Sequence, residues 1–425
     1  MYFNSASLKS KLIHNPTLFT LTASLAAFIC YSCMYGFRKP FTVGNYSEII
    51  FLGIPYKVCL VIAQVIGYMI SKIVGIKFIS SLPSKNRAVI IIICILIAWL
   101  SLLFFAITPA PYNLVFIFIN GLPLGLLFGL VFSFLEGRKT TEILAAFLVS
   151  SFIFASGFAK TVGKFILLNF SFHENWMPFL AGAFYIVPLC ISVYFLHNLP
   201  APNATDIAQR SVRDGMSKLD RRNFLKLFKW MIIPIVIVYT VLTISRDFIE
   251  DFANEFWIEN GYQNIASVFT NISILVSVLI LIVFAASFLV KKNKAALSYL
   301  YVLIFIGLSF MCIATFLFSF HHISAFYWML FTSTGLYMAY LPFNGLFFDR
   351  FIAVFKIKAN VGFIMYIADS FGYLGTVLLL LLKSFFHFTF TWTHFLTGLM
   401  FFASICCLLF IVYAFFKTIS KFKML

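Results

Sequence analysis

Twelve long apolar runs dominate this sequence and restrict what it can fold into. Each run is long enough for an α-helix, at 1.5 Å per residue, to cross the ~30 Å hydrocarbon layer of a bilayer. We place them approximately at 17–41, 54–76, 88–109, 112–135, 142–169, 176–197, 229–252, 265–290, 296–320, 324–348, 360–382 and 391–416. Backbone polar groups inside lipid must be satisfied within the protein, so we expect an all-α membrane protein with twelve transmembrane helices.

The composition excludes an ordinary soluble protein. Only 11% of the residues are charged, whereas a soluble domain carries about 25%, so the bilayer is the expected partner of most of the exterior. A net charge of +17 would suggest nucleic acid in a soluble chain. Here the charges lie between and within membrane spans, so we expect no nucleic-acid partner. The eight cysteines lie in apolar runs, and we expect no metal and no cofactor.

The longest polar stretch divides the chain into two halves. We expect an N-terminal six-helix bundle at 1–198, a cytoplasmic linker at 199–228 and a C-terminal six-helix bundle at 229–425. Arg38 near the end of the first run and Arg246 in the seventh run occupy equivalent places in the two halves. Two pseudo-symmetric six-helix bundles are the architecture of major facilitator transporters, which bind solute between the halves.

The distribution of charges predicts the orientation in the membrane, because cytoplasmic loops carry an excess of Lys and Arg. With a cytoplasmic N-terminus, the even-to-odd connections hold Lys77, Lys85, Arg87, Arg138, Lys139, Lys291, Lys292, Lys294, Arg350, Lys356 and Lys358. The external loops hold Glu48, His173, Glu174, Glu255, Glu259, His321, His322, His387 and the basic Lys383. We therefore expect a multi-pass protein of the plasma membrane, a bacterial inner membrane, with both termini in the cytoplasm.

Charged side chains inside the spans are the candidate functional residues, because each costs at least ~2.5–3.5 kcal/mol at the centre of a bilayer. Arg38 and Arg246 are the strongest candidates, since a guanidinium fits phosphate or carboxylate oxygens with two parallel hydrogen bonds. The repeat would bring them to opposite walls of one cavity. The alternative is that both side chains extend to the outer headgroups.

Further basic and aromatic residues extend this candidate anion site. Lys39 follows Arg38, Lys72 lies in the second run, and Lys160 lies in the fifth. Lys160 shares a helix face with Lys164, and the two ammonium groups repel each other unless an acid or an anion lies between them. Tyr31 and Tyr35 precede Arg38 by one and two turns and are candidates to line the same cavity, with packing as the alternative.

Two acids inside the second half are candidates for charge compensation or ion coupling. Asp369 lies near the middle of the eleventh run, where it either neutralises a basic residue in the absence of solute or carries a coupling proton. Asp247 directly follows Arg246, and we expect it to be a local partner of that charge or a residue of an outer gate. For Gly157, Gly163, Gly372 and Gly375 we expect close helix packing.

Four short motifs resemble one branch of the major facilitator superfamily, the organophosphate:phosphate antiporters. They are Tyr31-Ser-Cys-Met-Tyr35-Gly-Phe-Arg38-Lys39-Pro-Phe, Tyr68-Met-Ile-Ser71-Lys72, Tyr239-Thr-Val-Leu-Thr-Ile-Ser-Arg246-Asp, and Gly372-Tyr373-Leu374-Gly375. The resemblance implies that Arg38 and Arg246 hold a phosphate group and that Lys72 assists. Two features depart from it: Ile79-Ser80-Ser81 replaces the usual Asp-Arg after the second span, and the fifth span has no counterpart of the family's histidine. A side family of unknown function that carries a similar Arg-Lys-Pro-Phe motif is the alternative.

These features predict a secondary active transporter of a small organic anion, a phosphorylated solute, working by alternating access in exchange for phosphate. The alternatives are a proton-coupled symporter of another anionic solute and a non-transporting membrane sensor of a phosphorylated solute. No nucleotide-binding or catalytic motif is present in the sequence, so we expect no enzyme activity. We expect a monomer.

Overall fold

The computed structural model describes residues 5–46, 49–80, 82–83, 86–135, 141–201, 218–287, 290, 292–344, 346–355, 361–385 and 391–422. These residues form two compact units, which are described separately. Unit 1 comprises residues 1–211 and 264–277, and unit 2 comprises 212–263 and 278–425. Helix α11, Val268–Ser287, therefore begins in unit 1 and ends in unit 2. Much of the predicted linker 199–228 lies outside the described residues.

Unit 1 is helical except for one short hairpin. Its helices are α1 Ser5–His14, α2 Pro16–Arg38, α3 Tyr56–Ser80, α4 Arg87–Ile107, α5 Leu114–Leu124, α6 Leu127–Leu135, α7 Thr141–Asn169 and α8 Met177–His197, with the 3₁₀ helix η1 at Pro40–Val43. Strand β1, Ile50–Phe51, pairs antiparallel with β2, Ile54–Pro55. Leu52 and Gly53 in the turn both have positive φ, 54° and 76°, as a two-residue hairpin requires.

Unit 2 consists of helices in its described part. They are α10 Lys218–Glu259, α12 Asn293–Ser319, α13 Ala325–Tyr340, α14 Leu346–Phe355, α15 Val361–Phe385 and α16 Trp392–Phe422, with the 3₁₀ helix η3 at Leu341–Asn344. Helix α10 begins at Lys218, inside the segment predicted as linker, and contains a non-helical residue at Phe252. A helix therefore forms earlier in the chain than the apolar run indicates.

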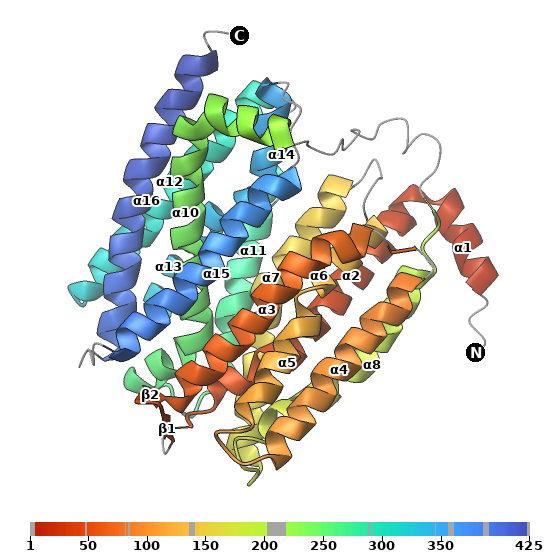
Figure 1. Cartoon of the computed structure of the whole chain (residues 1–425), viewed down its shortest axis with the longest axis vertical. Helices are drawn as coiled ribbons and strands as arrows, with labels where there is room; N and C mark the ends of the chain where they lie inside the picture. Colours follow the sequence, from red (N-terminus) through yellow and green to blue (C-terminus); the bar gives the residue numbers. More distant parts are fainter. Residues whose placement is uncertain are drawn as a thin grey trace. The chain divides into compact units, whose positions relative to one another are not determined.

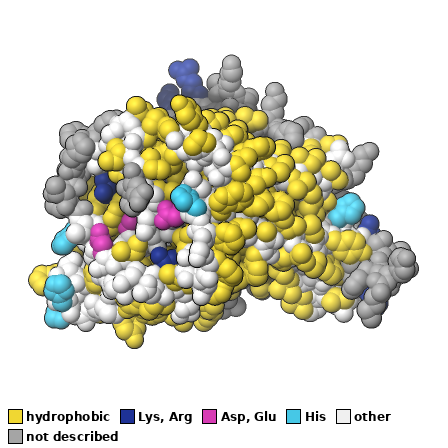
Figure 2. Space-filling model, turned by 90° about the horizontal axis from the view of Figure 1, so that it is seen from below, with side chains coloured by type: hydrophobic (Ala, Val, Ile, Leu, Met, Phe, Trp, Pro, Cys, Tyr) yellow, Lys and Arg dark blue, Asp and Glu magenta, His cyan; other side chains and the backbone are white. Residues whose placement is uncertain are grey.

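The helices have the length and surface expected for a bilayer. In the part of the chain that the structure describes, nine helices are long and apolar enough to cross a membrane, and the shorter apolar segment Val268–Phe284 lies in α11. Large apolar side chains stay exposed on several of them, including Val187 at 67% and Leu409 at 69%. Figure 2 shows hydrophobic side chains over broad areas of one face, with charged side chains gathered in small groups. The chain is thus a multi-pass, all-α membrane protein.

The same helix pairings occur in both units. In unit 1, α2 packs against α7 and α8, and α4 packs against α5 and α8. In unit 2, α10 packs against α15 and α16, and α12 packs against α13 and α16. Figure 1 shows α4 beside α8 and α10 beside α16. Helices six predicted spans apart therefore have equivalent neighbours, as the predicted pair of pseudo-symmetric six-helix bundles requires.

Local sequence determines where individual helices begin and break. The Asn15 side chain accepts a hydrogen bond from the Leu18 amide at 3.0 Å, and Pro16 occupies the first turn of α2, a typical helix start. The fourth predicted span is divided into α5 and α6 close after Pro123, and the tenth into α13 and α14 across Pro342. Proline lacks the amide proton that a continuous helix needs.

The orientation predicted from charge stays a prediction. Several residues on which it depends lie outside the described residues: Glu48, Lys85, Arg138, Lys139, Lys291, Lys356, Lys358 and His387.

Candidate functional site

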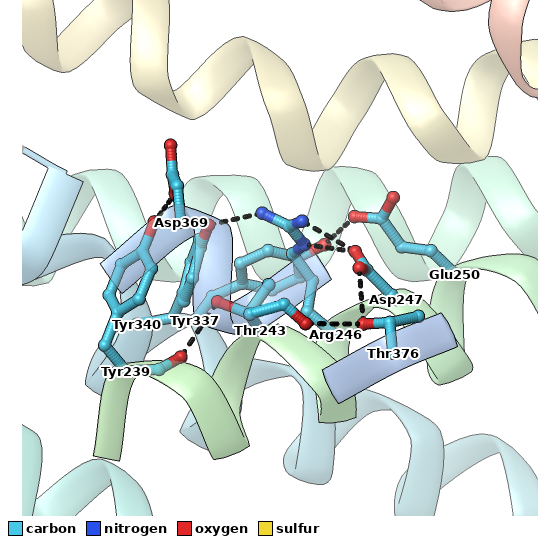
Figure 3. A network of polar contacts seen from close by, with 10 residues as sticks. Tyr239, Thr243, Arg246, Asp247, Glu250, Tyr337, Tyr340, Asp369 and Thr376 are labelled. Atoms are coloured by element: carbon cyan, nitrogen blue, oxygen red, sulfur yellow. Dashed lines mark hydrogen bonds and ion pairs between the residues drawn. The ribbon is translucent and has the colours of Figure 1, made fainter. Parts of the chain in front are cut away.

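One face of α10 carries a row of polar side chains in unit 2. Tyr239, Thr243, Arg246 and Glu250 follow one another at spacings of four, three and four residues, which places them on one side of a helix. Tyr239 is fully buried and Glu250 is 7% exposed. The network that these residues form with α13 and α15 is drawn in Figure 3.

Arg246 is held by a carboxylate on one side and a tyrosine on the other. Its Nη2 and Nε donate to Asp247 Oδ1 at 2.6 and 3.1 Å, which forms an ion pair. Its Nη1 donates to the Tyr340 hydroxyl on α13, and its Cζ lies 4.8 Å from the centre of that ring. The charge is thereby compensated by an anion and by the face of an aromatic ring.

The Tyr340 hydroxyl continues the network towards α15. It lies 3.3 Å from the Tyr239 hydroxyl, and the two rings are stacked with centres 5.3 Å apart. The Tyr239 hydroxyl donates to Asp369 Oδ1. Arg246 and Asp369, both predicted site residues, are therefore joined through two tyrosines, and the ion pair of Arg246 is made with Asp247.

Two further hydroxyl groups bind the carboxylates of α10. Thr376 on α15 donates to Asp247 Oδ2 at 3.0 Å, and Tyr337 on α13 donates to Glu250 Oε1 at 2.5 Å. Both Asp247 and Glu250 are buried. These bonds help hold α10, α13 and α15 together around Arg246.

Unit 1 places Arg38 against aromatic rings in a similar way. Its Cζ lies 4.1 Å from the centre of the Tyr68 ring on α3 and 5.9 Å from that of Tyr35. Lys72 Nζ lies 5.5 Å from the same Tyr68 ring. Tyr68 thus lies against Arg38 and Lys72, and Arg38 also lies near Tyr35; Arg38, Lys72 and Tyr35 were all predicted as site residues.

A buried amide network fixes the end of α2 that carries Arg38. Asn120 Nδ2 donates to the Phe37 and Ala98 carbonyls at 3.1 and 3.0 Å. Gln64 Nε2 donates to Asn120 Oδ1 at 2.8 Å and to the Arg38 carbonyl at 3.1 Å. Asn120 is fully buried. The last turn of α2 is thereby attached to α3, α4 and α5.

The remaining predicted residues of unit 1 are also buried. Lys39, at 1% exposed, follows α2, while Lys160 and Lys164 lie on α7 with exposures of 5% and 8%. Tyr31 packs against Phe152 and Phe128, with ring centres 5.0 and 5.7 Å away. It lies 5.7 Å from the Tyr35 ring.

The two units bury opposite kinds of charge. The buried ionisable side chains described in unit 1 include Arg38, Lys39, Lys57, Lys160 and Lys164, and none of its buried residues that the structure describes is an acid. Unit 2 buries Asp247, Glu250 and Asp251. Within the described ranges, no three His, Cys, Asp or Glu residues are grouped as metal ligands. Arg38 and Arg246 belong to different units, and their sharing of one cavity stays a prediction.

No sequence pattern singles out several members of these networks: Gln64, Asn120, Tyr337, Tyr340 and Thr376. Tyr68 and Tyr239 lie within the motifs that resemble the antiporter family. The helical spacing of Tyr239, Thr243 and Arg246 was an available signal for the unit 2 network. With 57 Phe and 19 Tyr in the chain, aromatic content alone does not separate site residues from packing residues.

Comparison with known proteins shows the fold. The profile of a family described as "Family of unknown function (DUF5690)" matches residues 40–419. No curated protein sequence matches the chain. Among solved structures, a D-xylose-proton symporter is similar with a TM-score of 0.61 and 15% identity, over 92% of this chain and 96% of that one.

Two further transporters share the fold. The nucleoside transporter NupG has a TM-score of 0.60 and 15% identity, over 93% of this chain and 98% of its own. A bacterial homologue of the human lysosomal transporter Spinster was solved in an inward-facing and unoccupied conformation. It has a TM-score of 0.60 and 13% identity, over 94% of this chain and 96% of its own. These are transporters of the major facilitator fold, and at this identity the likeness concerns the fold.

Proposed function

Because the chain belongs to DUF5690, a family of unknown function, and has the major facilitator fold, we propose that it is a secondary active transporter of a small anionic solute. It would work by alternating access, as the fold allows. The observation that carries the proposal is that each unit holds a guanidinium against a tyrosine ring, Arg38 on Tyr68 and Arg246 on Tyr340.

The chemistry of these two sites favours an anion. A guanidinium carries its N–H groups in one plane, and this planar fork matches two oxygens of a phosphate or carboxylate. The buried lysines of unit 1 add positive charge within the bundle that carries Arg38. Asp247 and Tyr340 already bind Arg246, so a solute anion there would displace the Tyr340 hydroxyl or share the guanidinium with Asp247.

A phosphorylated solute exchanged for inorganic phosphate is the finer proposal. It is supported by the resemblance of the Arg38, Lys72 and Arg246 motifs to the organophosphate:phosphate antiporters. Proton-coupled symport is the second candidate, and it is favoured by the hydrogen-bonded connection between Asp369 and Arg246. The two candidates differ in whether uptake depends on phosphate inside or on a proton gradient.

The test is uptake by proteoliposomes loaded with inorganic phosphate and given a panel of labelled organic anions and labelled phosphate. We expect uptake of at least one phosphorylated anion and its loss in Arg38→Gln and Arg246→Gln. A charged hydrogen bond is worth about 1.5–3 kcal/mol, so affinity should fall about 10- to 150-fold.

The matched control is Lys417→Gln. Lys417 is an exposed cation 5.5 Å from the Tyr413 ring, so it reproduces a cation beside a tyrosine ring without the buried setting, and we expect wild-type uptake. Uptake that survives both arginine substitutions would overturn the assignment of the site. Binding of an anion without any translocation would favour a membrane sensor.

A further inference from the structure

The geometry points to Asp369 as a proton-binding site whose protonation state is transmitted to Arg246 through the hydroxyl groups of Tyr239 and Tyr340. This inference rests on the proposed transport of an anion and develops its second candidate, proton-coupled symport, because it names the proton as the coupling ion. Proton binding at Asp369 would favour anion binding at Arg246, and the two would cross the membrane together.

The first step is that the hydrogen bonds joining Arg246, Tyr340, Tyr239 and Asp369 have a fixed direction. A tyrosine hydroxyl has one proton to donate. Tyr239 donates to Asp369 Oδ1, so its oxygen accepts the proton of Tyr340 across 3.3 Å. Tyr340 has then used its proton and accepts from Arg246 Nη1. The order of donation is Arg246, Tyr340, Tyr239, Asp369, and it ends on a carboxylate that only accepts.

The second step is the difference in burial between the side chains of this hydrogen-bonded series. Tyr239 is fully buried and Tyr340 is 2% exposed, and their rings stack on each other. Asp369 is only partly buried. The carboxylate that ends this series is therefore more accessible within unit 2 than the two tyrosines, which are buried.

The third step is the effect of a proton on Asp369. The hydrogen bond from Tyr239 loses its charge assistance, and charge-assisted hydrogen bonds are roughly twice as strong as neutral ones. If the new acid group donates to Tyr239 instead, Tyr239 must turn its proton towards Tyr340. Tyr340 would then face two donors and would have to turn its own proton away. Either change loosens the tyrosine pair that occupies Arg246 Nη1.

The consequence is a favourable coupling between proton and anion. Protonation removes a negative charge from the network and weakens the hold of Tyr340 on the guanidinium, so both effects favour a solute anion at Arg246. Coupling between two sites typically changes affinity about 5- to 150-fold. By thermodynamic reciprocity, the bound anion favours the proton at Asp369 by the same factor.

Other ionisable groups surround Asp369 in unit 2. Helix α15 packs against α10 and α14, and α10 packs against α13. The hydrogen-bonded network connects Asp369 with Tyr239, Tyr340, Arg246 and Asp247. Tyr373 lies on α15 itself, and Asp349 and Arg350 lie on α14. Arg350 donates to Asn293 at 2.7 Å, and Asp247 is engaged by Arg246 and Thr376. Asp369 is the residue that ends the tyrosine chain.

The test is infrared difference spectroscopy of the purified protein in lipid vesicles, between neutral and acidic pH and without any solute. We expect a carboxylic-acid band on acidification together with a change in the guanidinium bands. Asp369→Asn should lose the part of the acid band that Asp369 contributes, together with the guanidinium change. Tyr239→Phe should keep the acid band and lose the guanidinium change, because the connection is broken while the carboxyl group remains.

The matched control is Tyr301→Phe. The Tyr301 hydroxyl on α12 is also buried in unit 2, but it is hydrogen-bonded to the Thr418 hydroxyl on α16 at 2.8 Å, outside the network around Arg246, so both signals should persist. An acid band that survives Asp369→Asn at full size, or a guanidinium change of wild-type size in Tyr239→Phe, would overturn the inference.

A transport arm separates this inference from the proposed function. An inward proton gradient should drive accumulation of labelled inorganic phosphate in wild-type proteoliposomes, and Asp369→Asn should abolish it. Accumulation by Asp369→Asn at the wild-type level would overturn the inference while the transporter assignment stands. Absence of uptake of any anion by wild type would overturn the transporter assignment, and the solute-free spectra would still decide the proton site.

Discussion

Single side chains keep charges inside this apolar protein by giving each one several partners. Arg246 has the carboxylate of Asp247, the hydroxyl of Tyr340 and the face of its ring, and Asp247 has Thr376 as a second donor. Removing one member of such a buried pair is costly, because the other charge stays behind without compensation. The network is therefore expected to be sensitive to each substitution.

Asn120 gives a stability prediction at this scale. Asn120→Leu keeps the branching and the number of side-chain heavy atoms but leaves the Phe37 and Ala98 carbonyls without their side-chain amide donor. We expect the free energy of unfolding to fall by about 1–3 kcal/mol, measured by unfolding in mixed detergent micelles. Ser101→Ala is the control, because the Ser101 hydroxyl donates within its own helix, to Ile97. It should lower the free energy of unfolding by less than Asn120→Leu does. Equal losses in the two variants would contradict the positioning role of Asn120.

Glu259 gives a second prediction. Its carboxylate accepts from the Trp392 and Thr393 amides, both at 2.7 Å, and from the Thr393 hydroxyl at 2.8 Å. These amides begin α16 and have no partner within the helix. Glu259→Gln should lower the free energy of unfolding by about 0.5–2 kcal/mol, seen as a lower Tm in detergent. Thr393→Ser keeps every donor and should match wild type; a Tm for Glu259→Gln equal to that of wild type would exclude this cap.

The candidate charges were predictable from the sequence, and their partners were not. An Arg or Asp inside an apolar run stands out because of its cost in lipid, which identified Arg246, Asp247 and Asp369. The partner hydroxyls of Tyr340 and Thr376 lie 94 and 129 residues away along the chain. Only the packing of α10 against α13 and α15 brings them together, and no local pattern contains that information.

At the scale of helices, the approach of α15 to α10 decides whether the unit 2 network can form. A Cβ atom on Gly372 would lie 2.8 Å from Thr243 Cγ2 and 2.9 Å from its Cβ, and one on Gly375 would lie 2.7 Å from Ile244 Cδ1. Small residues at these positions let the two backbones come close. The packing role predicted for this glycine pair agrees with these distances.

This approach predicts a specific effect of one methyl group. Gly372→Ala should force α10 and α15 apart and lower the free energy of unfolding by about 1–3 kcal/mol, with a matching loss of solute uptake. Gly398→Ala is the control, because a Cβ there meets nothing within 4 Å, and it should leave stability unchanged or raised. If both variants unfold alike, close approach of α10 and α15 is not required.

The predicted spans agree with the helices because each run is long, apolar and bounded by polar residues. The interruptions were missed for a physical reason. Pro123 and Pro342 lie inside otherwise apolar runs, so hydropathy continues across them while the backbone hydrogen bonds do not. The early start of α10 at Lys218 was also missed, because its first turns are charged and hydropathy does not report a helix outside lipid.

At the scale of the whole molecule, the recurrence of helix pairings ties the function to the fold. The pairs formed by α2 and α4 in unit 1 have counterparts formed by α10 and α12 in unit 2. Both α2 and α10 carry an arginine that rests on a tyrosine of another helix. A repeated bundle that carries an arginine in each copy is compatible with the proposed transport by alternating access.

The orientation of the molecule gives the last prediction. The hairpin turn at Leu52 is 78% exposed and follows the first span, so a cytoplasmic N-terminus places it outside the cell. In a variant without the native cysteines, Leu52→Cys in intact cells should react with a membrane-impermeant maleimide. Ala295→Cys, exposed in the first turn of α12, should react only after permeabilisation. The opposite labelling pattern would show that the orientation is the reverse of the predicted one. Labelling of both sites in intact cells would contradict the predicted number of spans between them.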